Sequence, residues 1–206
     1  YMKESINILL PEDSSDITVE QSQRYMSIAD RDNLSDLDKT KRIVKLFTGL
    51  KTKDVDAMSI NDYEGIVSQI TEALNTEAEF THRFTLDGVE FGFIPNLDEM
   101  TTGEYIDLSA SGVSADTLHK TMAILFRPVI KTDAFGNYEI ESYRADSKYN
   151  ELMKQAPMNI VNGMLVFFCH LSNELQKCIR KSTEVIVEEV KRKQQDTLRS
   201  GDGIVH

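Results

Sequence analysis

The stretch PMNIVNGMLVFFCHLSNELQKCIRKSTEVIVEEVKRKQQDTL, residues 157–198, is the segment around which the rest of the chain is organised. Its apolar residues recur mostly every three or four positions, which is the pattern of one face of an α-helix. They are Ile160, Met164, Phe168, Leu171, Leu175, Ile179, Ile186 and Val190. We therefore expect one long C-terminal helix that begins next to Pro157.

The expected helix changes character near residue 180. Between Ile160 and Ile179 its apolar arc is broad enough for a helix that is packed on nearly all sides. After Arg180 the residues are mostly charged, and only a narrow apolar seam remains. The seam consists of Val185, Ile186, Val187 and Val190.

The length of this helix suggests a use for the seam. A helix of about 40 residues spans about 60 Å, whereas a compact chain of this size has a radius of gyration of about 17 Å. The distal half is therefore either a solvated tail or a docking surface for a partner or a neighbouring copy. A solvated helix has no reason to carry four β-branched residues so close together. We predict an interface at the seam, with one domain over residues 1–179 and a helical extension over residues 180–206.

The N-terminal segment contains a second apolar stretch. Ile6 and Ile8 precede Pro11, a pattern that fits an edge strand or an extended arm. We expect both isoleucines to contribute to contacts between chains.

Helices are expected between residues 18 and 75. Thr18 and Gln21 have the spacing of a capping box, and Ser35 and Ser59 precede two further amphipathic segments. Three helices joined by short polar links indicate a small helical subdomain.

The hydrophobic period changes to two between residues 80 and 94. Apolar residues alternate around Asp87 and Gly88, a dipeptide that two-residue hairpin turns favour. Gly92 on the return strand suggests a bulge or a close backbone contact. Gly136 and Asn137 indicate a second hairpin. With a further capping box at Thr101 and Glu104, the expected fold is α+β, mainly helical.

Composition and motifs favour no chemical activity. The net charge of −11 argues against a protein that binds nucleic acid by neutralising phosphates. Glu104 and Asp107 form a possible carboxylate pair, but capping already explains Glu104. No spacing typical of a metal site, a phosphate loop or an activated nucleophile occurs, and no apolar run has the length of a membrane span. We expect a non-enzyme of cytosolic origin without cofactor, metal, small-molecule substrate, nucleic acid or membrane partner.

Several phrases of the sequence resemble a known group of proteins. The phrases are FGFIPNL (residues 91–97), MTTGEYIDL (residues 100–108), LFRPV (residues 125–129) and Pro157 followed by Gly163 and Phe167-Phe168. Together they resemble structural or morphogenetic proteins of the neck or tail region of tailed bacteriophages that infect Bacteroidetes, including the crAss-like phages. The similarity covers about residues 17–175. In this context we expect Gly103 to allow a close approach of its helix to the hairpin, and Tyr105, Ile106 and Leu108 to form the buried face.

The resemblance implies a virion structural protein with no enzymatic activity. The leading hypothesis is a ring of identical copies in the neck or tail, made in the bacterial host cytoplasm and built into the virion, where it contacts other phage proteins. A second hypothesis is a phage tail assembly chaperone that is absent from the mature particle. A phage enzyme or host-directed regulator is a third.

Overall fold

The structure, a computed structural model, describes residues 8–146, 148–174, 176 and 177. These residues form mainly helices together with a four-stranded antiparallel sheet, so the predicted α+β fold is confirmed. The chain divides into two units, residues 1–164 and residues 165–206. The predicted domain boundary between residues 179 and 180 lies outside the described residues.

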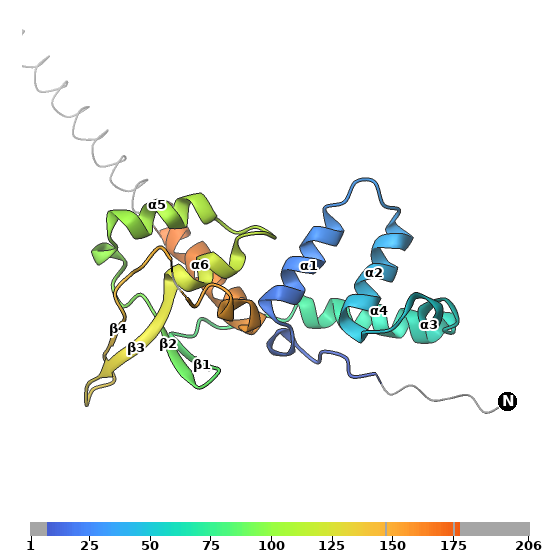
Figure 1. Cartoon of the computed structure of the whole chain (residues 1–206), viewed down its shortest axis with the longest axis horizontal. Coiled ribbons are helices and arrows are strands. Elements are labelled where there is room, and N and C mark those ends of the chain that lie inside the picture. Colours follow the sequence, from blue (N-terminus) through green and yellow to red (C-terminus); the bar gives the residue numbers. More distant parts are fainter. Residues whose placement is uncertain (1–7, 147, 175, 178–206) are drawn as a thin grey trace, which may run out of the picture. The chain divides into compact units, whose positions relative to one another are not determined.

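Four helices follow one another in the first part of the chain (Figure 1). They are α1 (Val19–Ala29), α2 (Asp36–Thr48), α3 (Thr52–Asp56) and α4 (Ile60–Leu74), and a short 3-10 helix, η1 (Ser14–Asp16), precedes them. Thr18, Ser35 and Ser59 cap α1, α2 and α4 through their hydroxyl groups, as predicted. Because α2 packs against α1, α3 and α4, these helices form the expected helical subdomain.

The sheet has the strand order β1-β2-β3-β4. Its strands are β1 (Arg83–Leu86), β2 (Val89–Phe93), β3 (Phe126–Thr132) and β4 (Tyr138–Ile140). Leu86 pairs with Val89 across a turn in which Asp87 and Gly88 both have positive φ, 49° and 75°. This geometry confirms the predicted two-residue hairpin. The second predicted hairpin is confirmed by the antiparallel pair β3 and β4.

An aromatic cluster holds the sheet together. Phe91 and Phe126 are fully buried, and the ring of Phe84 lies 5.7 Å from the first and 5.3 Å from the second. Gly92, on the same strand, has a close neighbour, but this neighbour is a side chain and not the backbone contact that was predicted. A Cβ atom at Gly92 would lie 2.5 Å from the ring of Tyr138, whose hydroxyl donates to the Phe93 carbonyl at 2.8 Å. The missing side chain at Gly92 therefore makes room for Tyr138 on the sheet.

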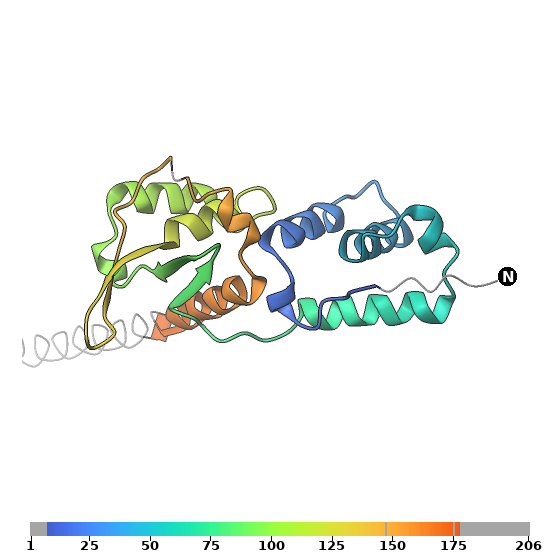
Figure 2. The ribbon, with the colours of Figure 1, turned by 60° about the horizontal axis from the view of Figure 1, so that its bottom comes forward.

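Two helices cover one face of the sheet (Figure 2). They are α5 (Thr102–Ser111), which follows the 3-10 helix η2 (Leu97–Glu99), and α6 (Leu118–Leu125), which leads directly into β3. The predicted buried face of α5 is wrong. Tyr105 and Ile106 are 65% and 58% exposed, and Glu104 is the buried residue of this helix. The expected close approach at Gly103 is also wrong, because a Cβ atom there would meet nothing nearer than 3.8 Å.

The start of α1 is joined to a segment far away in the sequence. Val19 N donates to Ala156 O at 2.9 Å, and Met158 N donates to Ile17 O at 2.8 Å. The second segment follows the 3-10 helix η3 (Leu152–Gln155) and opens the C-terminal helix, whose described residues are 158–174, 176 and 177. Ile17, Val19 and Ala156 are fully buried, so this junction belongs to the core.

The C-terminal helix differs from the prediction along its described part. Ile160, Val161 and Met164 are buried, but Val166 is 43% exposed and Cys169 is exposed. The predicted packing on nearly all sides is therefore not found at Val166 and Cys169. The rest of the expected helix lies outside the described residues.

Candidate functional site

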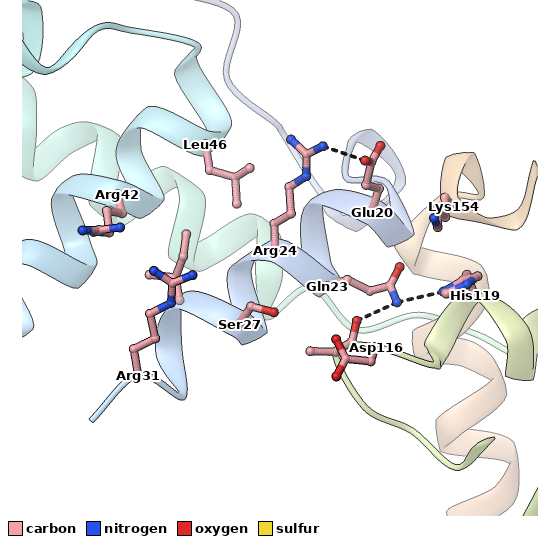
Figure 3. A pocket seen from close by; sticks show the side chains of 12 residues that line it. Glu20, Gln23, Arg24, Ser27, Arg31, Arg42, Leu46, Asp116, His119 and Lys154 are labelled. Carbon is pink, nitrogen blue, oxygen red and sulfur yellow. Dashed lines mark hydrogen bonds and ion pairs between the residues drawn. The ribbon is translucent and has the colours of Figure 1, made fainter. Parts of the chain in front are cut away.

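A cleft of about 570 Å³ runs along one side of α1 (Figure 3). The helix contributes a single stripe, because successive lining positions are one or three residues apart. The α1 residues are Glu20, Gln23, Arg24, Ser27 and Ile28. The remaining lining residues are Arg31, Arg42, Leu46, Ala115, Asp116, His119 and Lys154. The cleft therefore combines residues of α1, α2, α6 and η3 with residues of two loops.

Gln23 and His119 lie at one end of the cleft, and both are only 7% exposed. Gln23 Nε2 donates to Ala115 O at 2.7 Å and lies 3.0 Å from His119 Nδ1. The carbonyl of Ala115 fixes the orientation of the Gln23 amide, because it only accepts hydrogen bonds. Since the amide donates to both groups, His119 Nδ1 accepts, and the neutral ring carries its proton on Nε2.

The surroundings keep His119 neutral. Burial lowers the pKa of His119, and the positive charges of Lys154 and Lys120 lower it further, while Glu151 acts in the opposite direction. Protonation would place a hydrogen on Nδ1 and break the contact with Gln23. The hydrogen bond and the lowered pKa thus favour the same protonation state.

The other end of the cleft carries positive charge. Arg31 and Arg42 lie there (Figure 3), and neither side chain has a hydrogen bond or an ion pair with another residue in the described part of the chain. Arg24, by contrast, is paired with Glu20 at 2.7 Å. The lining has four cationic and two acidic side chains, whereas the whole chain has 23 Lys and Arg against 34 Asp and Glu. The cleft therefore reverses the charge balance of the protein.

A second polar cluster joins α5 to β3. Arg127 Nη2 lies 2.7 Å from Glu104 Oε1, with side-chain exposures of 12% and 3%. Burial lowers the pKa of Arg127, and the Glu104 carboxylate opposes this shift. Because the two charges are paired in a buried place, the cluster has the character of a structural tie.

A tyrosine extends this cluster. The Tyr143 hydroxyl donates to an Asp107 carboxylate oxygen. Burial and the hydrogen bond to Asp107 raise the pKa of Tyr143 to about 12. The phenol therefore stays protonated at neutral pH and acts as a hydrogen-bond donor, so Asp107 is engaged in structure and no longer suggests acid-base catalysis.

The structure places the predicted residues as follows. Asp87 and Gly88 form the hairpin turn, and Thr101 and Glu104 form the expected capping box. Ile8 is half-buried in a segment without regular secondary structure, so no edge strand includes it. The predicted interface residues Ile6, Val185, Ile186, Val187 and Val190 lie outside the described residues. Among the described residues, Ile8, Asp87, Gly88, Thr101 and Glu104 do not line the cleft.

The residues of the cleft were not found from the sequence. The sequence patterns described above assign no role to Gln23 or His119. Arg31 and Arg42 come from a loop and from a different helix, and nothing in their spacing shows that they share a surface. The local signal was the polar stripe of α1, but its partners are set by tertiary packing.

The described part of the chain has no group of three His, Cys, Asp or Glu side chains that could hold a metal ion. No helix among the described residues is both long and apolar enough to cross a membrane. Comparisons with protein-family models, with curated proteins and with solved structures gave no match.

Proposed function

We propose that the chain is a structural protein of a tailed bacteriophage that infects Bacteroidetes, and that its copies assemble into a ring in the neck or tail. The resemblance of residues 91–97, 100–108 and 125–129 to such phage proteins supports the proposal, as does one structural observation. That observation is Phe135, which lies in the turn between β3 and β4 and is 92% exposed.

The turn around Phe135 is built to hold a fixed shape. Asp133 Oδ1 accepts hydrogen bonds from Phe135 N at 2.8 Å and from Asn137 N at 2.9 Å, and Asp133 Oδ2 accepts from Asn137 Nδ2 at 2.8 Å. Gly136 supplies a positive φ of 88°. These hydrogen bonds lower the pKa of Asp133, and the bond from the Asn137 side chain has the largest effect. The protein therefore presents a large apolar ring on an ordered turn.

An ordered apolar projection is suited to association. Covering a phenylalanine side chain contributes about 2 kcal/mol, and a preorganised turn loses little entropy when it docks. Leu9 in the N-terminal arm, at 95% exposure, and Ile130 on β3, at 63%, add apolar surface of the same kind. Head-to-tail contacts between such projections and a different face of the next copy generate a ring if the rotation closes. The seam at residues 185–190 stays a predicted further contact.

Mass spectrometry of gradient-purified phage particles tests the proposal. We expect purified particles to contain a fixed number of copies of the chain for each copy of the portal protein. Its absence from finished particles, together with its presence in the infected cell, would favour a tail assembly chaperone and reject the ring.

A further inference from the structure

The cleft along α1 has a shape and a charge that suit one kind of occupant. Glu20 and Ile28 lie eight positions apart on α1, about 12 Å along the axis. About four residues of an extended peptide span the same length. A volume of about 570 Å³ lies within the usual range of ligand sites.

Arg31 and Arg42 provide the recognition chemistry. Both guanidinium groups are without a partner in the described part of the chain, and each presents a planar fork of donors that fits a carboxylate. Asp38, four residues before Arg42, accepts instead from Ser35 Oγ at 2.7 Å. Ile28 and Leu46 also line the cleft and supply apolar surface, and His119 lies at the opposite end.

We infer that this cleft binds an acidic polypeptide segment, with carboxylates on Arg31 and Arg42 and an apolar side chain against Ile28 and Leu46. The length of the cleft along α1 favours a peptide, because a free dicarboxylate is too short to contact both ends of the cleft. Charge complementarity favours an acidic segment, because the lining is cationic in a chain whose net charge is −11. The inference does not depend on the proposed function, since it concerns a different surface from the β3–β4 turn.

A binding experiment with the full chain tests the inference. The probe is a fluorescein-labelled peptide of alternating glutamate and leucine, and its anisotropy is measured at about 0.1 M salt, where long-range attraction is screened. The variant is Arg31→Gln/Arg42→Gln. The matched control, Lys53→Gln/Lys131→Gln, removes the same charge from exposed positions outside the cleft.

We expect the wild-type chain and the control to bind the probe, and the arginine variant to bind about tenfold more weakly for each arginine removed. A peptide with glutamine in place of glutamate should not bind. Three results would overturn the inference: no binding by the wild-type chain, equal binding by the arginine variant, or equally tight binding of single-stranded DNA. Since Arg31 and Arg42 are exposed, their replacement should leave thermal unfolding unchanged.

Discussion

Arg127 Nη2 lies 2.7 Å from Glu104 Oε1, and the other carboxylate oxygen of Glu104 accepts a 2.6 Å hydrogen bond from Thr101 N. One buried carboxylate thus closes the capping box of α5 and ties that helix to β3. This double role explains why α5 buries a charged residue and leaves Tyr105 and Ile106 exposed. Those two side chains add to the apolar surface that is available for contacts with other chains.

Replacing Arg127 by methionine should lower the free energy of unfolding by about 3 kcal/mol, because the Glu104 charge stays buried without its partner. The control is Arg83→Met, which removes an exposed pair with Glu90 whose atoms are 3.6 Å apart, and we expect it to cost less than about 1 kcal/mol. Urea unfolding measures both. If the pair is a structural tie, Glu104→Gln/Arg127→Met should cost less than the sum of the single changes; additive costs would contradict it.

Two glycines should respond to alanine in opposite directions. Gly88→Ala should destabilise the chain by about 1 kcal/mol, because a side chain is strained at a φ of 75°. Gly65→Ala should stabilise it by about 0.5 kcal/mol, because Gly65 lies within α4 and an added Cβ meets no atom within 4 Å. Thermal unfolding measures both variants, and we expect the midpoint temperature to fall for Gly88→Ala and to rise for Gly65→Ala. Equal shifts in the midpoint temperature would argue against the hairpin turn.

A second glycine comparison tests how the segment before β1 packs. Gly163→Ala should cost about 2 kcal/mol, because its Cβ would lie 2.3 Å from the carbonyl oxygen of Glu79, a backbone atom. Gly103→Ala should be neutral or slightly stabilising, since its Cβ has no neighbour nearer than 3.8 Å. Chemical unfolding of both variants checks this order, and a larger loss at Gly103 would contradict the packing described.

The stability of the chain should depend on the protonation of His119. Because its pKa is lowered in the folded protein, the unfolded chain takes up a proton at a pH where folded His119 stays neutral. The contribution is fully present above the ordinary value of 6.5 and is lost as the pH falls below it. His119→Gln should remove this part of the pH dependence, as seen by unfolding at about pH 7.5 and about pH 5. An unchanged difference between the two pH values would reject the assignment.

Association should depend on the ring of Phe135. Phe135→Ser should weaken self-association while leaving the fold intact, because the side chain is 92% exposed. Asp133→Ala keeps the ring but removes the hydrogen bonds that order the turn, so we expect a smaller loss. Sedimentation velocity compares the two variants with the wild-type chain. A larger effect of Asp133→Ala would show that turn order matters more than the apolar contact.

The sequence predicted features that local chemistry decides. Thr18 and Thr101 cap helices through their own hydroxyl groups, and Asp87-Gly88 sets a turn by its backbone preferences. The buried face predicted for α5 was wrong, because Glu104 is buried through its ion pair with Arg127, which lies more than twenty residues away in the sequence. It also gave no sign that Gly163 faces the backbone of Glu79.

The cleft was beyond prediction for the same reason. Arg31 and Arg42 belong to different segments, and only the packing of α1 against α2 brings them to one surface.

The predicted seam at residues 185–190 lies outside the described residues and stays a prediction. Replacing Ile186 and Val190 with Asp would show whether it takes part in assembly.

Native mass spectrometry of the purified full chain tests the central claim, that exposed apolar side chains join identical copies. The account predicts association that rises with protein concentration and ends at one closed copy number, and a shift to monomers in Phe135→Ser. A chain that stays monomeric at every concentration, or an assembly that Phe135→Ser leaves unchanged, would contradict it.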